Sequence, residues 1–351
     1  MHNCADDVIA YQQSEVALPQ AEQTNMRQRR DANRKRLKSG LEAKNKPMPI
    51  EFYKQGSYAM KTMVQDPDKL YDIDDGVYFD KNDLKGERGA EMSSLQVRQM
   101  VRDAVDDGSF KRAPEVLTNC VRVYYDAGYH VDLPSYRRII NKTLTGEEVF
   151  FELAGTEWKR SDARDVTDWF KKQNSEKSPD EENGRQFRRG CRLLKKFAQS
   201  RPSWRDCIAS GFMITTLASE RYMPNASRED EALYNTMVAI RDRLEGSLVV
   251  NHPVTPGDTI TKGTEDPKAK FLKERLSDAI RWLAPTLRVD CSREEALACW
   301  DKVFNTEFFS KRGGTDQGGG GGKKAVSASV FSSGDSPSRT PVRKDGGGTY
   351  A

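Results

Sequence analysis

The chain has 351 residues, enough for two domains or for one elaborated domain followed by a tail. Hydrophobic residues make up 36% of it and charged residues 31%, and no apolar run reaches the length of a membrane-spanning helix. The formal net charge of +4 is small for this length, which argues against a surface that binds nucleic acid over its whole extent.

The composition also limits the compartment and the metal chemistry. The N-terminus lacks the basic and apolar regions of a secretory signal, and the six cysteines show no C-x-x-C spacing. We therefore expect a cytoplasmic protein with reduced, mostly buried thiols. Only three histidines are present, so carboxylates must carry any metal, and carboxylate oxygens favour Mg²⁺ or Mn²⁺.

The first half of the chain mixes helices and strands. Residues 22–44 combine good helix formers with regularly spaced apolar residues and end before Pro47, which predicts a long amphipathic helix. A second helix is expected at residues 92–105. Strands are expected at 72–79, 120–125, 129–133 and 148–153, with the two middle strands joined as a hairpin through residues 126–128.

The second half of the chain is predicted to be helical up to a polar tail. Helices are expected at 162–173, 185–199, 209–219, 229–246, 268–284 and 294–304. Residues 313–351 are rich in Gly, Ser, Thr and Pro, so they cannot bury enough apolar surface to offset the entropy of ordering. The sequence therefore predicts an α+β protein with a disordered C-terminal tail.

Three aspartates on the predicted strands are candidate metal ligands. Asp72 and Asp74 are one residue apart on a strand, so both side chains point the same way and can hold one divalent cation. Asp132 lies on the strand 129–133, whose alternate residues face the core and turn this carboxylate to the open face. A third carboxylate on a neighbouring strand would complete a two-metal site with ions about 3.5–4 Å apart.

A Gly-Ser pair ahead of these aspartates can hold phosphates. Gly56 lets the backbone approach a phosphate closely, and the Ser57 hydroxyl can donate a hydrogen bond to it. Each motif alone is weak, because a Gly-Ser pair is usually a turn and the acidic run could be a loop. The later ligands of an EF-hand are missing. Together, in this order and with this strand parity, the motifs predict a nucleotidyltransferase with Asp72, Asp74 and Asp132 as its catalytic and metal-binding residues.

The helix at 185–199 adds a cationic face. Arg188, Arg192 and Lys195 lie at i, i+4 and i+7, opposite an apolar face. Such a stack can be a solvated surface, but it also suits a triphosphate, and Lys195 is the favoured phosphate contact. At residues 161 and 162, Ser161 or Asp162 is expected to cap the following helix, and the segment can also contact nucleotide.

These residues resemble the bacterial CD-NTase family of cyclic-oligonucleotide synthases, in particular its DncV-type branch. The resemblance covers about residues 20 to 310. The matching strings are residues 55–58 (Gln-Gly-Ser-Tyr), 72–78 (Asp-Ile-Asp-Asp-Gly-Val-Tyr), 129–134 (Tyr-His-Val-Asp-Leu-Pro) and 188–195 (Arg-Arg-Gly-Cys-Arg-Leu-Leu-Lys).

The resemblance implies a bilobed, polymerase-β-like nucleotidyltransferase fold. A catalytic domain at residues 1–155, with a mixed sheet and a long N-terminal helix, would pack on a helical domain at residues 156–312 that completes the nucleotide pocket. Ser210 stands where the family often carries a Ser pair. The nucleotide-binding residues expected in this pocket are Gln55, Gly56, Ser57, Tyr58, Ser161, Arg192, Lys195 and Ser210.

The resemblance also implies an activity. We expect an enzyme that uses two Mg²⁺ ions, or Mn²⁺, to join ATP and GTP into a 3′,3′-linked cyclic dinucleotide, with cyclic GMP-AMP as the first expectation. The product would activate an effector in CBASS antiphage defence, with no need for membrane or nucleic acid. The alternatives are nucleotide addition to RNA or a small molecule, a cyclic trinucleotide or pyrimidine-containing product, and an inactive nucleotide-binding sensor.

The last residues of the tail predict a conjugation site. The chain ends in Gly-Gly-Gly-Thr-Tyr-Ala, and a small, flexible carboxyl terminus can thread into the narrow site of an adenylating enzyme. Some CBASS operons encode ubiquitin-transfer-like enzymes, so Ala351 is predicted to be conjugated to a target amine. The alternative is an inert terminus.

Overall fold

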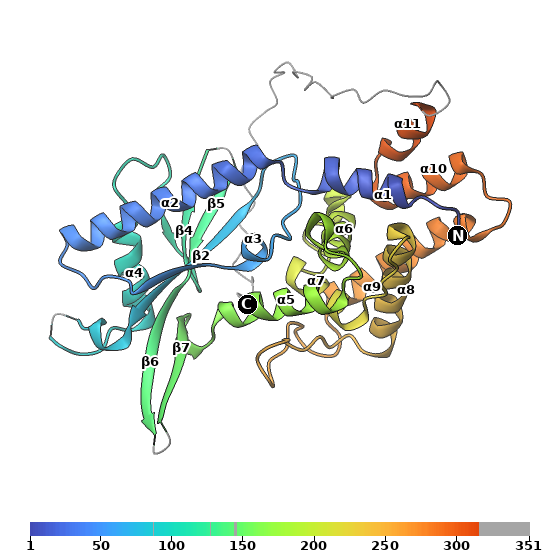
Figure 1. Ribbon diagram of the computed structural model, residues 1–351. Coiled ribbons are helices and arrows are strands. Elements are labelled where there is room, and N and C mark those ends of the chain that lie inside the picture. Colours follow the sequence, from blue (N-terminus) through green and yellow to red (C-terminus); the bar gives the residue numbers. More distant parts are fainter. Residues whose placement is uncertain (87, 127, 144–145, 316–351) are drawn as a thin grey trace.

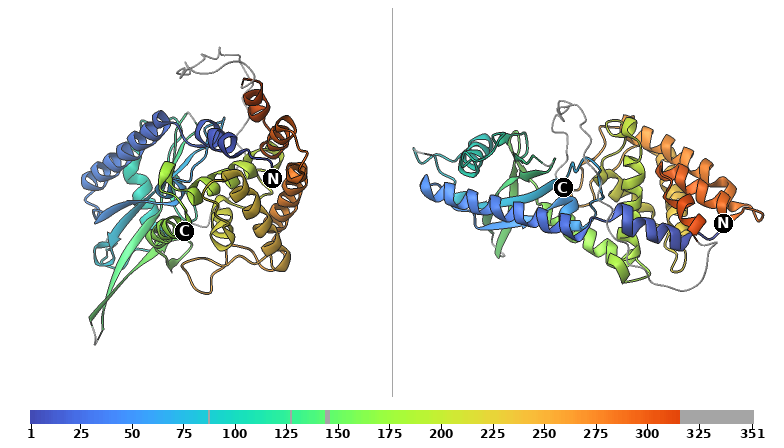
Figure 2. Two further views of the ribbon diagram at one scale, coloured as in Figure 1. Left: turned by 45° about the vertical axis from the view of Figure 1, so that its right-hand side comes forward. Right: turned by 90° about the horizontal axis from the view of Figure 1, so that it is seen from above.

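The computed structural model describes residues 1–86, 88–126, 128–143 and 146–315. They form a half built on a β-sheet and a half built of helices, which lie side by side along the length of the molecule (Figures 1 and 2). Each half has its own large cluster of buried apolar side chains. The predicted α+β fold is confirmed.

The sheet is mixed, with strand order β3-β4-β5-β2-β6-β7-β8 and β1 paired with β2 off this path. The central strand β2 is parallel to both β5 and β6, and the other neighbours are antiparallel. The strands of the described residues are β1 (Glu51–Lys54), β2 (Asp72–Asp80), β3 (Glu115–Val116), β4 (Val121–Tyr124), β5 (His130–Leu133), β6 (Ser135–Thr143), β7 (Gly146–Ala154) and β8 (Trp158–Arg160).

All four predicted strands are present, as β2, β4, β5 and β7. The long strand β6 was not predicted. Its first residues are buried, but Ile140, Asn141 and Lys142 are exposed, because β6 and β7 extend together beyond the rest of the sheet (Figure 1). A strand that is exposed on both faces lacks the alternation of apolar and polar residues by which strands are recognised.

Two helices cover one face of the sheet. The predicted long helix is α2 (Gln20–Ala43), and it packs with α4 (Ser94–Val105) over the β2 residues Ile73 and Val77. Ser93 and Gln96 form a capping box that fixes the start of α4. The opposite face of β2 is therefore left for the candidate site, which lies beside the short helix α3 (Gly56–Met60).

The helical half contains all six helices that the sequence predicts. They are α5 (Ala163–Lys177), α6 (Gln186–Gln199), α7 (Gly211–Arg221), α8 (Glu229–Gly246), α9 (Pro267–Leu283) and α10 (Arg293–Phe304). Two further helices are α1 (Ala5–Tyr11), continued by the π-helical turn Gln12–Val16, and α11 (Phe308–Thr315). Shorter 3₁₀ turns occur at Lys81–Asp83, Glu182–Gly184, Pro202–Trp204 and Ala284–Leu287.

The N-terminal helix α1 packs in the helical half, although the expected catalytic domain begins at residue 1. The buried Asp7 carboxylate accepts hydrogen bonds of 3.1 Å from Arg293 and Arg312. The Tyr11 ring lies 4.7 Å from that of Phe304, measured between centroids. The chain therefore starts in the helical half and crosses to the sheet half before α2.

The predicted tail lies mostly outside the described residues. Helix α11 includes residues 313–315, so the first three residues of the predicted tail are helical. Residues 316–351, and with them Ala351, are not described.

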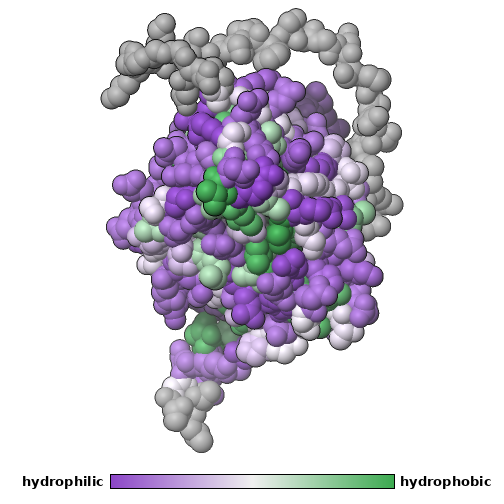
Figure 3. All heavy atoms as spheres, turned by 90° about the vertical axis from the view of Figure 1, so that its right-hand side faces the viewer, coloured by the Kyte–Doolittle hydropathy of each residue, from purple (hydrophilic) through white to green (hydrophobic). Residues whose placement is uncertain are grey.

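Surface and thiol properties agree with the composition. No described helix is both long and apolar enough to cross a membrane. The outer face of the helical half is mostly hydrophilic (Figure 3). The cysteines form no disulfide, and all are buried except Cys207.

Candidate active site

Strand pairing brings the three aspartates together. In the parallel pair of β2 and β5, Asp74 lies beside Asp132 and Asp72 lies beside His130. The predicted position of the third aspartate on a neighbouring strand is confirmed. Asp75, the next residue of β2, points to the other face, where it is fully buried and binds Arg34 of α2 at 2.5 and 2.6 Å.

The prediction that Asp132 lies on an open face is wrong, because its side chain is buried under Arg122. Only 1% of Asp132 is exposed. Arg122 lies directly opposite it on the antiparallel strand β4, and its guanidinium donates hydrogen bonds of 2.8 and 2.7 Å to the two carboxylate oxygens. The strand alternation that turns the Asp132 side chain away from the core also places the side chain of Arg122, its partner on β4, over it.

The neighbouring carboxylates raise the proton affinity of Asp74. Burial, followed by the charges of Asp132 and Asp72, holds the pKa of Asp74 well above its usual value, while Arg122 opposes this shift. Burial disfavours the charge on Arg122, but its hydrogen bonds and ion pair with Asp132 outweigh that effect and raise its pKa. Arg122 is thus shared by Asp132 and Asp72, whose carboxylates its guanidinium contacts at 2.7 and 3.8 Å.

These residues fit a divalent metal in their chemistry but not in their present arrangement. Among the described residues, no three acidic, His or Cys side chains lie ready to hold an ion, since Arg122 binds both oxygens of Asp132. Carboxylate oxygens are hard ligands that suit Mg²⁺ or Mn²⁺. Asp72, Asp74 and Asp132 can serve as such ligands once Arg122 releases Asp132.

Gly56 lies against the aspartate cluster. Its φ of +59° is in the left-handed region, and a Cβ at this position would lie 2.2 Å from Oδ2 of Asp74. A side chain here would therefore be strained by the backbone conformation and would displace the Asp74 carboxylate. The half-buried Ser57 follows at the start of α3, so the predicted phosphate-holding loop lies next to the predicted metal ligands.

The side chain of Gln55 is directed into the protein rather than into the site. It is 1% exposed, and its amide is hydrogen-bonded to Tyr78 at 2.9 Å and to Tyr136 at 3.1 Å. Tyr58 is half-buried, with the guanidinium of Arg30 5.9 Å from the centroid of its ring.

The cationic face of α6 approaches the segment that follows α3. Arg192 Nε donates to the carbonyl oxygen of Lys61 at 2.8 Å, and Lys195 Nζ donates to Thr62 Oγ1 at 2.8 Å. Burial lowers the pKa of Lys195 to about 8 and that of Arg192 to about 10. The pKa of Arg188 is lowered in the same way, and no carboxylate of the described residues forms an ion pair with any of the three. This face therefore carries positive charge without an anion.

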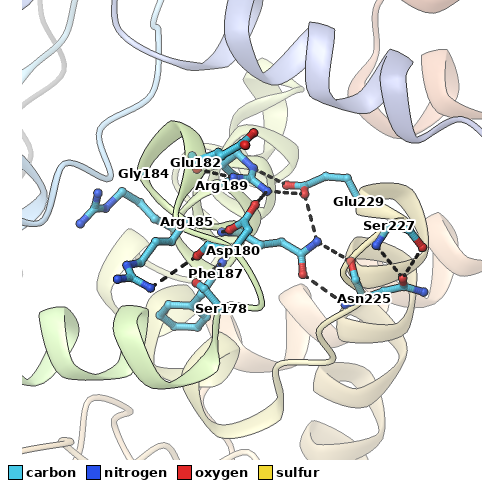
Figure 4. Close-up of polar contacts among 12 residues, drawn as sticks. Ser178, Asp180, Glu182, Gly184, Arg185, Phe187, Arg189, Asn225, Ser227 and Glu229 are labelled. Carbon is cyan, nitrogen blue, oxygen red and sulfur yellow. Dashed lines mark hydrogen bonds and ion pairs between the residues drawn. The ribbon is translucent and has the colours of Figure 1, made fainter.

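A buried polar network fixes the start of α6 (Figure 4). Arg189 binds Glu229 at 2.8 and 2.9 Å and Asp180 at 2.6 Å. Asp180 also accepts a hydrogen bond of 2.7 Å from the backbone N–H of Gln186, the first residue of the helix. Arg189 belongs to one of the strings that carry the family resemblance, yet the sequence did not reveal this anchoring role.

The remaining predicted residues have structural roles at the ends of helices and strands. Asp162 caps α5 by accepting a 3.0 Å hydrogen bond from the N–H of Arg164, which confirms the predicted cap. Ser161 is half-buried, and its N–H donates to the carbonyl oxygen of Phe151 at 3.0 Å. Ser210 is the N-cap of α7, and its Oγ accepts a 3.2 Å hydrogen bond from the N–H of Met213.

Comparison with known proteins gives consistent relatives. Residues 50–136 match the family described as cyclic GMP-AMP synthase DncV-like, nucleotidyltransferase domain. A cyclic GMP-AMP synthase of Escherichia albertii is 26% identical over 224 residues, which are 60% of this chain and 46% of that protein. The match therefore spans about half the length of that relative.

Solved structures share the fold at lower identity. Vibrio cholerae DncV, in complex with the linear intermediate 5′ pppA(3′,5′)pG, aligns over 87% of this chain and 96% of its own, with 17% identity and a TM-score of 0.67. Escherichia coli CdnC with ATP aligns over 87% of this chain and 98% of its own, with 16% identity and a TM-score of 0.60.

Proposed function

Because this chain is a member of the CD-NTase family with a DncV-like nucleotidyltransferase domain at residues 50–136, we propose that it synthesises a cyclic dinucleotide from nucleoside triphosphates. The observation that carries the proposal is the meeting of three groups at one place. These are the aspartates of β2 and β5, the Gly56-Ser57 loop against Asp74, and the anion-free cationic face of α6 beside the segment after that loop.

The proposed substrates are ATP and GTP, and the proposed product is 3′,3′ cyclic GMP-AMP. The support is that the Escherichia albertii relative is a cyclic GMP-AMP synthase and that the Vibrio cholerae complex contains an adenine–guanine intermediate.

Each side of the site has a separate task in the proposed reaction. Ser57 and the backbone at Gly56 bind the donor triphosphate, and Lys195 and Arg192 neutralise its charge. Asp72, Asp74 and Asp132 would hold Mg²⁺ or Mn²⁺, which in this chemistry lowers the pKa of the attacking hydroxyl and stabilises the phosphate charge. Lys195 is suited to its task because a buried cation without an anionic partner gains most from an arriving phosphate.

The bond changes follow from phosphoryl-transfer chemistry. The 3′-hydroxyl oxygen of one nucleotide attacks the α-phosphorus of the other, the bond from that phosphorus to the β-phosphate oxygen breaks, and pyrophosphate leaves. The linear dinucleotide then reorients in the same pocket, and the second attack closes the ring with loss of a second pyrophosphate.

A product assay tests the proposal. The purified protein is incubated with Mg²⁺ and radiolabelled ATP, GTP or both, then with phosphatase and a 3′–5′-specific nuclease, and the products are identified by mass spectrometry. We expect a phosphatase-resistant, nuclease-sensitive cyclic dinucleotide only when both nucleotides are present. A trinucleotide or pyrimidine product contradicts the product assignment alone, whereas label transferred to added RNA, or binding without turnover, contradicts the proposed reaction.

The biological part of the proposal is antiphage defence in the cytoplasm, through an effector that the messenger activates. The conjugation of Ala351 by a ubiquitin-transfer-like enzyme is part of this proposal. Deleting the last few residues should leave synthesis by the purified protein intact but abolish conjugates in cells that carry the neighbouring genes. Conjugates that persist after the deletion would show that the terminus is inert in this respect.

A further inference from the structure

A relay of buried hydrogen bonds lies behind the Gly56-Ser57 loop. It passes through Tyr136, Gln55, Tyr78 and Asp162, which come from β6, the residue before α3, β2 and the start of α5. The first three side chains are at most 1% exposed. The two tyrosine rings are stacked, with centroids 4.6 Å apart.

The hydrogen bonds of this relay all run in one direction. Tyr136 Oη donates to Gln55 Oε1 at 3.1 Å, Gln55 Nε2 donates to Tyr78 Oη at 2.9 Å, and Tyr78 Oη donates to Asp162 Oδ1 at 3.1 Å. Reversing the amide of Gln55 would make Tyr78 donate to it. Asp162 would then lose that donor, because a hydroxyl has a single hydrogen and an ionised carboxylate can only accept.

Gln55 packs closely against its surroundings. A Cβ at Gly76 would lie 2.0 Å from Gln55 Nε2, so the amide packs directly against the backbone of β2. The backbone N–H of Gln55 donates to the carbonyl oxygen of Asp74 at 2.9 Å. Gln55 is therefore held through both its backbone and its side chain, immediately before the residue whose backbone must approach a phosphate.

We propose that Gln55 is a positioning residue and not a nucleotide contact: its side chain, held by Tyr136, Tyr78 and Asp162, sets the position of Gly56 and Ser57. This inference rests on the proposed function, because it assumes that the loop binds a triphosphate. Since the phosphates of ATP and GTP are identical, loss of the relay should weaken by the same factor each nucleotide that binds with its triphosphate on this loop. A residue that reads a base would affect one nucleotide more than the other.

The test uses equilibrium binding of non-hydrolysable ATP and GTP analogues to the full chain. The variants are Gln55→Leu, Tyr136→Phe and their double variant. Tyr136→Phe keeps the packing and removes only the hydroxyl. The matched control is Tyr125→Phe, which removes a hydroxyl that donates to Asn33 at 3.1 Å on the α2 side of the sheet.

We expect Gln55→Leu and Tyr136→Phe each to raise the Kd of both analogues by the same factor, about fivefold for one lost hydrogen bond. The double variant should be no weaker than Gln55→Leu, because both changes break the same relay. Tyr125→Phe should leave both Kd values unchanged. KM should follow Kd, with a smaller change in kcat.

Two results would overturn the inference. The first is that Gln55→Leu changes the ratio of the Kd values for the ATP and GTP analogues while Tyr136→Phe leaves both Kd values unchanged. The other is unchanged Kd values with a lower Tm in both relay variants. A wild-type protein that binds both analogues but forms no cyclic product contradicts the proposed function and leaves this test valid, whereas one that binds neither contradicts both.

Discussion

The acidic and cationic sides of the candidate site differ in how their charges are compensated. On the acidic side, Asp132 is bound by Arg122 at 2.7 and 2.8 Å, within one pair of strands. On the cationic side, Lys195 and Arg192 donate to a neutral hydroxyl and a neutral carbonyl of the other half of the molecule. The strands therefore carry their own counter-charge, whereas the cationic face of α6 does not.

This difference assigns a separate energetic role to each side. Burial without a nearby anion lowers the pKa of Lys195 to about 8, so keeping it charged costs stability that an arriving triphosphate would return. A metal at the aspartates must instead displace an existing ion pair.

Replacing the aspartates that face the site should abolish turnover while keeping the fold. Asp72→Asn with Asp74→Asn removes the charge that holds the metal, so kcat should fall by at least about a thousandfold in steady-state assays. Tm should fall little, because burial and the neighbouring carboxylates already disfavour the charge on Asp74. Near-normal cyclisation would contradict the assignment of β2.

Asp75→Asn is the matched control for this double variant. Asp75 is on the same strand but faces α2, where it pairs with Arg34. The change should lower Tm while retaining most of the activity, the reverse of the double variant.

Removing Arg122 should cost stability that divalent metal restores. Arg122→Ala deletes the buried partner of Asp132, and breaking such a pair costs about 3 kcal/mol. Thermal unfolding should show a lower Tm for the variant than for wild type. Added Mn²⁺ should raise the Tm of the variant by more than it raises the Tm of wild type. Arg112→Ala, at an exposed residue that pairs with Glu115 at 3.0 Å, is the control. Equal shifts with Mn²⁺ in all three proteins would contradict a metal site at Asp132.

Removing the charge of Lys195 should weaken substrate binding without destabilising the protein. Lys195→Met should raise the KM for nucleotide about ten- to hundredfold, the range expected for a lost charge-assisted hydrogen bond. Its Tm at pH 7 should equal or exceed that of wild type. A large fall in Tm with unchanged KM would identify a purely structural lysine.

The pH dependence of stability supplies a second measurement on Lys195. Its pKa is about 8 in the folded protein against the usual 10.5, so the unfolded chain binds this proton more tightly. The buried charge therefore costs most at and below pH 8, and the free energy of unfolding should rise between pH 8 and 10.5. The Lys195→Met variant should lack this rise, as a comparison of denaturant unfolding at both pH values would show.

The positions that were predicted correctly follow from local rules. Strand alternation placed Asp72 and Asp74 on one face, and helical spacing placed Lys195 and Arg192 on one side of α6. The role of Arg122 was missed because it depends on the register of β4 against β5. A sequence can show that a polar residue alternates with apolar ones, but not which residue lies opposite it.

The relay of Gln55 was missed for a related reason. Tyr78 and Tyr136 come from two strands that meet only through the parallel pairing of β2 and β6, and β6 itself was not predicted. The burial of the two tyrosines depends on neighbours that are far apart in the sequence. The Gly-Ser pair beside them, in contrast, can be recognised from the sequence alone.

The smallest effect is expected at Ser210, which shows how far the nucleotide pocket extends along the cationic side. Ser210→Ala removes the N-cap of α7 and should cost about 1 kcal/mol. Ser292→Ala is the matched control, because Ser292 caps α10 in the same way by accepting from the N–H of Glu295 at 3.1 Å. Both variants should lose similar Tm. Since the oxygen of Ser210 is engaged by the cap while its hydrogen stays available to a phosphate, only Ser210→Ala should raise KM, by about threefold at most. A rise as large as that of Lys195→Met would place Ser210 among the main phosphate contacts, and equal KM values in the two cap variants would restrict it to capping.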